Sequence, residues 1–335
     1  MAQFYAGFYL GWFLTFGLCI AVLVATVRSE SRTKLLEQCK EQAPALLVSG
    51  VVAASVLAPL ALHYWGVATE LGFREYAEVE PMVPRLQSWI HCGGESWVYG
   101  LLSREWLASG LGMEHEHRLG IGLVTQTLSV LGLVLGRSRP AVRLMSVVGR
   151  ALFVLTLSLW GKSLWRFVFA TVPGAAAVRA VSRVSLVTLI PLCVGLALVL
   201  ESQVGVRRRG LFVVLLVVCR VEQGAALPSY DNSRVREHVA AIVAAVPAEA
   251  DAFLYTPEAG KVPGWHWLRD HVDAMWVSLE TGVPTVNGYS GNHPRDWLFY
   301  DIHVGSQSDL ERLDRARRHW FDFHDQDSTR IRWIR

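Results

Sequence analysis

Long apolar runs alternate with short polar segments over the first two thirds of the chain, and a polar stretch of different character follows. A helix needs about 20 apolar residues to cross the hydrocarbon core of a bilayer. Runs that reach or approach this length predict six spans, at 4–27, 44–65, 119–136, about 146–161, 184–200 and about 210–227. The pattern therefore predicts a transmembrane helical region over 1–227, with an outer loop at 67–117, and a soluble domain over 228–335.

The soluble tail shows the periodicities of mixed secondary structure. Ser233 can cap a helix that runs to about Val246, and a second helix is predicted over 308–320. Strands are predicted over 252–256, 275–279 and 330–334. The predicted fold class is therefore a membrane all-α helical bundle of about six spans followed by a small α/β soluble domain.

The distribution of arginine and lysine predicts the orientation. Hydrophobic residues make up 52% of the chain and charged residues 18%, and the basic residues gather in short loops at 28–40, 137–150 and 207–209. Such loops face the cytoplasm. This orientation predicts a multi-pass protein of the plasma (inner) membrane with an extracytoplasmic tail. It also leaves Met1 outside, which we expect of the C-terminal portion of a longer protein. The net charge of +3 and the lack of a basic stripe argue against a nucleic-acid partner.

Two groups of residues are candidates for binding. Arg179 and Arg183 are four positions apart, so a helix just outside the fifth span would carry both on one face, where they can hold a lipid phosphate. The alternative is that they meet ordinary lipid headgroups. In the tail, aromatic and amide side chains can form a glycan-binding platform, and the alternative is a turn-rich loop. These residues are Trp265, Trp267, Asn287, Tyr289, Asn292 and His293.

Other chemistry finds little support. The run from Glu114 to His117 offers metal-ligating side chains, but His115 and His117 would point to different faces of a helix and no third spaced ligand follows. No phosphate-binding loop and no Ser-His-Asp order is present. The sequence therefore predicts no metal and no cofactor, and it identifies no catalytic residue.

The stretch TVNGYSGNHP, residues 285–294, resembles the C-terminal domain of bacterial multi-spanning membrane proteins related to the GT-C-fold glycosyltransferases and the YfhO-like group. The proline-glycine turn at 173–174, which precedes the two arginines, and the junction from Glu116 to Gly120 are similar as well. The resemblance implies transfer of a sugar from a polyprenyl-phosphate donor at the outer membrane face, with an acidic residue in the first outer loop as the base. That loop and its base have no counterpart in this chain.

The leading hypothesis is therefore a membrane protein that resembles the C-terminal half of a polyprenyl-phosphate-sugar-dependent glycosyltransferase, a hexosyltransferase type or an inactive fragment of one. Its expected partners are membrane lipid and a polyprenyl-phosphate-linked sugar. The alternative is a non-catalytic membrane scaffold whose tail binds a glycan or a partner protein. A transporter is disfavoured because the predicted spans hold few ionisable groups and show no repeat.

Overall fold

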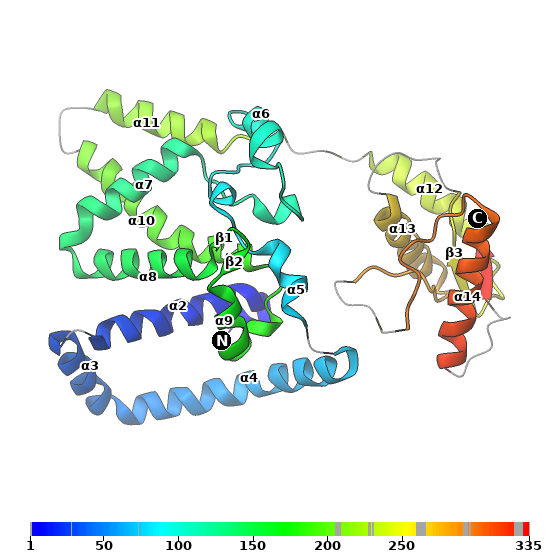
Figure 1. Ribbon diagram of the computed structural model, residues 1–335, viewed down its shortest axis with the longest axis horizontal. Helices are drawn as coiled ribbons and strands as arrows, with labels where there is room; N and C mark the ends of the chain where they lie inside the picture. The colour runs from blue at the N-terminus through cyan, green and yellow to red at the C-terminus, as the bar shows by residue number, and fades with distance from the viewer. Residues whose placement is uncertain are drawn as a thin grey trace. The chain divides into compact units, whose positions relative to one another are not determined.

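The computed structural model describes residues 2–27, 29–72, 74–204, 209–226, 229, 231–258, 266–290, 294, 296–324 and 331–334. The chain divides into two compact units, Met1–Pro228 and Ser229–Arg335. Helices dominate the first unit, in which a long helix pair, α2 and α4, is joined through α3 (Figure 1). Its elements are α1 (Ala2–Ala6), α2 (Phe8–Val27), α3 (Ser29–Glu41), α4 (Ala43–Leu71), α5 (Tyr76–Val79), α6 (Gly100–Leu102), α7 (Leu123–Leu135), α8 (Pro140–Thr156), β1 (Ser158–Leu159), β2 (Lys162–Ser163), α9 (Trp165–Thr171), α10 (Val184–Val204) and α11 (Arg209–Glu222).

Three helices in the described part of the chain are long and apolar enough to cross a membrane, as expected of a membrane protein. They cover Phe8–Val27, Ala43–Glu70 and Val181–Ser202. The other three predicted spans coincide with α7, α8 and α11, which have 13, 17 and 14 residues. At a rise of about 1.5 Å per residue these helices measure only ~20 to ~26 Å, short of a hydrocarbon core of about 30 Å. The prediction of about six spans is therefore supported for three.

Aromatic residues fill the core of the first unit. Phe13 of α2 and Trp165 of α9 are fully buried, and their ring centroids lie 5.6 Å apart. Leu152 of α8 joins the same cluster. The Trp12 indole N–H donates a hydrogen bond of 3.0 Å to the carbonyl of Pro173, in the proline-glycine turn. This bond ties α2 to the segment that leads into α10, so the irregular backbone there is held by packed side chains.

Two glycines let α7 and α10 approach closely. A Cβ added at Gly132 of α7 would lie 1.8 Å from the carbonyl oxygen of Gly195, and one added at Gly195 of α10 would lie 2.0 Å from that of Ser129. Small residues at such crossings allow helix backbones to pack closely, a recurrent feature of membrane helices. The close packing of α7 against α10 therefore depends on the absence of side chains at these two positions.

The Glu222 carboxylate, at the end of α11, caps the start of α7. It accepts hydrogen bonds from the backbone N–H groups of Val124 and Thr125, at 2.9 and 2.8 Å, and from the Thr125 hydroxyl at 2.7 Å. The Tyr99 hydroxyl, from the loop between α4 and α7, donates to the same carboxylate. An anion suits this position because the first N–H groups of a helix lack partners within the helix.

The second unit contains α12 (Asn232–Ala245), β3 (Ala252–Tyr255), α13 (His266–Thr281), α14 (Gln307–Phe323) and β4 (Ile331–Ile334). Strands β3 and β4 pair in parallel, with Ala252 opposite Ile331. Alternate residues of a strand face opposite sides of a sheet. Accordingly, Phe253 and Tyr255 pack with residues of α12 and α13, whereas Leu254 packs with residues of α14.

One predicted strand is wrong. Residues 275–279 lie inside α13, because the apolar positions that are buried follow a helical rather than an alternating spacing. Ala274 and Val277 are fully buried, three positions apart, while Trp276 and Leu279 are 58% and 77% exposed. The short window around Met275 was apolar on both faces and so resembled a strand.

We predict that Gly132→Ala destabilises the first unit, because the new methyl group would overlap the Gly195 carbonyl. Overpacking of this kind typically costs about 1–3 kcal/mol. The measurement is thermal unfolding of the detergent-solubilised chain. Gly50→Ala in α4 is the matched control, since nothing lies within 4 Å of its added Cβ. Equal unfolding temperatures for Gly132→Ala and the unaltered protein would contradict the close helix approach.

Candidate functional site

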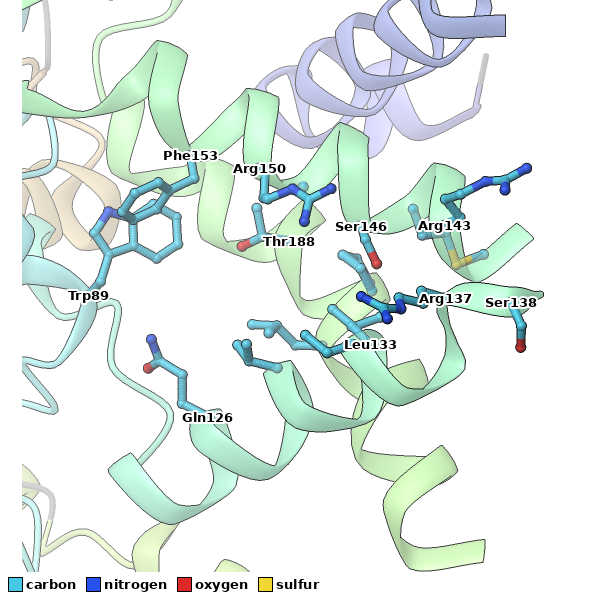
Figure 2. Close-up of a pocket in the computed structure, with 16 residues that line it drawn as sticks. Trp89, Gln126, Leu133, Arg137, Ser138, Arg143, Ser146, Arg150, Phe153 and Thr188 are labelled. Carbon is cyan, nitrogen blue, oxygen red and sulfur yellow. The ribbon is translucent and has the colours of Figure 1, made fainter. Parts of the chain in front are cut away.

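One candidate site is a cavity of about 830 Å³ between α7, α8 and α10, here called the arginine-lined cavity (Figure 2). Its walls are mostly apolar. Its lining residues are Trp89, Gln126, Val130, Leu133, Val134, Arg137, Ser138, Arg143, Met145, Ser146, Gly149, Arg150, Phe153, Thr188, Pro191 and Leu192. A volume of this size lies within the range of ligand pockets, roughly 300–1,000 Å³.

Three arginines give the cavity its charge. Figure 2 shows Arg137 and Arg150 extending into the space between α7 and α8, while Arg143 points away from it. Among the residues that the structure describes, no carboxylate lies within ion-pairing distance of any of the three. The lining also contains no Asp, Glu or His in the described part of the chain. The cavity thus combines an apolar interior with unpaired positive charge and lacks a group for proton transfer.

In the sequence these arginines act as orientation signals. The helical period contains a second signal, which indicates a shared face of α8. Ser146, Arg150 and Phe153 recur at spacings of four and three and so lie on one face of this helix. All three line the cavity.

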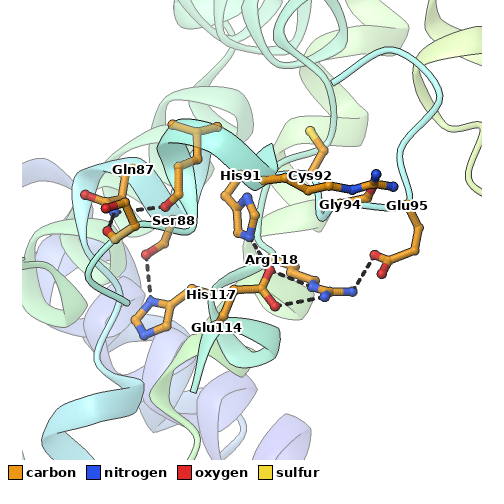
Figure 3. Close-up of polar contacts among 12 residues, drawn as sticks. Gln87, Ser88, His91, Cys92, Gly94, Glu95, Glu114, His117 and Arg118 are labelled. Atoms are coloured by element: carbon orange, nitrogen blue, oxygen red, sulfur yellow. Dashed lines mark hydrogen bonds and ion pairs between the residues drawn. The ribbon is translucent and has the colours of Figure 1, made fainter. Parts of the chain in front are cut away.

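A separate polar network stabilises the loop between α4 and α7 (Figure 3). The His117 imidazole is fully buried. Its Nε2–H donates to the carbonyl of Pro81 at 2.7 Å, since a carbonyl can only accept, and its Nδ1 accepts from the Ser88 hydroxyl at 2.8 Å. Ser88 in turn accepts from the backbone N–H of Arg85 at 2.9 Å. Burial lowers the pKa of His117, so the neutral ring satisfies every bond in this chain.

The Glu114 carboxylate is the centre of a second part of the network. It contacts Nε2 of the buried His91 at 2.5 Å and accepts two hydrogen bonds from the Arg118 guanidinium, at 2.9 and 2.8 Å. Arg118 also donates to Glu95 at 2.7 Å. The hydrogen bonds from Arg118 hold the pKa of Glu114 below its usual range. Since Glu114 and His117 use different partners, the run from 114 to 117 does not converge on one point.

The predicted lipid-phosphate pair does not share a helical face. Arg179 precedes the short turn Val181–Arg183, and Arg183 ends it before α10 begins. The Arg183 guanidinium lies 3.5 Å from the Glu116 carboxylate and 4.7 Å from the centre of the Tyr9 ring. The helical spacing assumed from sequence fails because the proline-glycine turn at 173–174 is followed by short turns rather than by a continuous helix. Phosphate binding by this pair stays a prediction.

The predicted glycan platform is described in part. Trp265, Asn292 and His293 lie outside the described residues, as does the side chain of Trp267 in α13. Asn287 is 4% exposed, and its side-chain amide bonds both the N–H and the carbonyl of Tyr255, at 2.7 and 2.9 Å. Asn287 therefore stabilises the end of β3. Tyr289 is about half exposed and lines a second cavity of about 430 Å³.

The carboxyl end of β3 brings together titratable groups that the sequence analysis did not connect. Tyr255 ends the strand, His238 lies on α12, and Asp270 and Asp273 lie on α13. The Tyr255 hydroxyl is 3.4 Å from Nε2 of His238. Burial raises the pKa of Tyr255 to about 12, and the two aspartates add to this effect, so the phenol stays protonated. Burial also raises the pKa of Asp273.

Comparisons with known proteins identify no relative: no family model, no curated protein and no solved structure matches this chain.

We predict that acidification weakens the loop between α4 and α7. Because burial holds the pKa of His117 below its usual 6.5, the unfolded loop binds a proton below pH 6.5 that the folded loop does not. Stability therefore falls as the pH drops below this value and is fully present above it. The measurement is amide hydrogen exchange of loop peptides at pH 7.5 and 5.5, corrected for intrinsic rates.

His117→Gln should reduce this pH dependence and should itself cost about 1–3 kcal/mol of local stability, because a buried hydrogen-bonding group loses its matched partner. His115→Gln is the control, since His115 is exposed and lies in the same short turn. An unchanged pH dependence in His117→Gln would rule out His117 as its source.

Proposed function

We propose that this chain is an integral membrane protein that binds a lipid with a phosphate headgroup in the arginine-lined cavity, and that the lipid is of the polyprenyl-phosphate class. One observation carries the proposal: two arginines without a described acidic partner extend into an apolar cavity between helices. The chemical class rests on the sequence resemblance to polyprenyl-phosphate-dependent glycosyltransferases.

The lining matches the two parts of such a ligand. Val130, Leu133 and Phe153 offer an apolar surface to a hydrocarbon chain. Arg137 and Arg150 offer planar guanidinium groups, which bind phosphate oxygens through paired hydrogen bonds and are weakly hydrated. A phosphate between them would gain charge-assisted hydrogen bonds without displacing an existing ion pair.

Sugar transfer itself needs a carboxylate or another base. Because the described lining of the cavity has none, this site supports lipid binding, and a hexosyl transfer would need a base from elsewhere. The alternative, a non-catalytic scaffold, is favoured by α4. None of the apolar window of this helix is buried within the protein, so most of the surface of that window is open to lipid or to a partner helix.

We further propose a multi-pass plasma-membrane topology with the tail outside. The basic residues at 137–150 and in α3 support it, since such segments stay in the cytoplasm. It requires α7, α8 and α11 to cross the membrane together with the three long helices.

The topology predicts that a single cysteine at Glu311, exposed on α14, reacts with a membrane-impermeant thiol reagent on intact cells, whereas one at Lys34 in α3 does not. Each cysteine is introduced singly into a variant without the five natural cysteines. Permeabilised cells, in which both positions should react, are the control. Protection of 311 on intact cells would contradict an external tail.

The lipid proposal predicts that Arg137→Gln with Arg150→Gln weakens binding of a polyprenyl phosphate by at least about tenfold, because two charge-assisted contacts are lost. Binding is measured on the purified full chain by native mass spectrometry or by a fluorescent-lipid competition assay. Arg139→Gln is the matched control, since Arg139 belongs to the same basic loop but does not line the cavity.

One further ligand, phosphatidylglycerol, identifies the source of the phosphate. Weak binding of phosphatidylglycerol and strong binding of polyprenyl phosphate would support the proposed class, and the reverse would assign the cavity to an ordinary anionic phospholipid. Equal binding by the double variant and the unaltered chain would overturn the proposal. Arg179→Ala with Arg183→Ala, tested beside it, measures the pair predicted from sequence.

A further inference from the structure

Three side chains from two helices of the second unit converge at the carboxyl end of β3. The candidate ligand atoms of His238, Asp270 and Asp273 all lie within 4.8 Å of one another. Asp270 and Asp273 are only 5% and 2% exposed. Two carboxylates that close together and that deeply buried are costly without positive charge, because burial penalises each anion and each repels the other. The cluster therefore differs from a solvated acidic surface.

The positive charge available from the described residues is incomplete. Arg269 approaches Oδ2 of Asp273 at 3.4 Å, and 42% of its side chain is exposed. His238 Nε2 lies 3.6 Å from that same oxygen. The Arg269 contact is a long hydrogen bond, and the His238 contact is longer than a hydrogen bond.

The spacing suits a bound metal ion. With metal–ligand bonds of about 2.0–2.1 Å, two ligands in tetrahedral coordination lie roughly 3.3 Å apart. The 3.6 Å between His238 Nε2 and Asp273 Oδ2 is close to this separation, and an imidazole with two carboxylates is a ligand set that divalent transition metals accept.

A second layer of residues orients one of these ligands. His303 Nε2 lies 2.9 Å from Oδ2 of Asp270, and its Nδ1 lies 3.2 Å from the Asp301 carboxylate. Metal-binding carboxylates are commonly fixed in this way by hydrogen-bonded neighbours. One carboxylate oxygen of Asp270, Oδ2, is thus held by His303.

We propose that His238, Asp270 and Asp273 bind a divalent metal ion of the Zn²⁺ or Mn²⁺ type. Three protein ligands leave at least one coordination position, and the partly exposed side of His238 opens this position to solvent. The position would hold water or an oxygen of a bound ligand. This site belongs to the second unit and is independent of the lipid proposed for the first.

The test is a titration of the purified, chelator-treated full chain with Co²⁺, which reports its coordination through visible absorption. The expected result is one saturable Co²⁺ per chain, displaced by Zn²⁺. His238→Gln and Asp273→Asn should each weaken Co²⁺ binding by at least about tenfold, as loss of a metal ligand or its support does.

His319→Gln is the matched control, because His319 pairs with Asp296 at 3.1 Å on the same unit and belongs to no three-residue cluster within the described residues. Its Co²⁺ affinity should equal that of the unaltered chain. His238 is partly exposed, so His238→Gln keeps the test open even where Asp273→Asn fails to fold, as circular dichroism would reveal. Absence of saturable Co²⁺ binding, or unchanged affinity in His238→Gln, would overturn the proposal.

Discussion

The first unit depends on the Glu222 carboxylate. Its hydrogen bonds join the end of α11, the start of α7 and, through Tyr99, the loop that precedes α7. Glu222 is itself buried, so separating these segments would leave a carboxylate and the first N–H groups of a helix without partners. The start of α7 is thereby fixed, and the glycine contacts with α10 fix its course further along. The arginine-lined cavity exists because α8 packs against α10 without filling the space beside α7.

The two candidate sites lie in different units and differ in chemical character. The arginine-lined cavity is apolar and positively charged, which favours an amphiphilic anion, yet its described lining offers no base. The cluster of His238, Asp270 and Asp273 has the opposite character: polar, negatively charged and small. Neither site reproduces the catalytic outer loop that the sequence resemblance implies, so a binding role is the function that both sites support without an added residue.

The sequence predicted what depends on local patterns and failed where distant residues decide. Apolar runs located the three long helices, and local period located α12, β3, α14 and β4. An apolar run does not show where a helix ends. The runs that contain α7, α8 and α11 therefore predict spans, although turns end these helices before the predicted spans end. The sequence predicts Asn287 as a sugar ligand, because the sequence of a turn does not show whether a side-chain amide has a hydrogen-bond partner. In the fold this amide bonds the backbone of Tyr255. The convergence of His238 with Asp270 depends on the packing of α12 against α13, which no local spacing reveals.

The basic segment at 137–150 has two separable roles, one in membrane orientation and one in phosphate binding. Orientation depends on the number of positive charges near the ends of a span and is indifferent to where each side chain points. Phosphate binding depends on direction, because a guanidinium must present its N–H groups to the ligand. Arg143 lines the cavity but extends away from Arg137 and Arg150, and Arg139 does not line it, yet both count toward orientation. Loss of Arg137 and Arg150 therefore weakens mainly phosphate binding. The orientation is kept, since the two remaining arginines keep the segment positive.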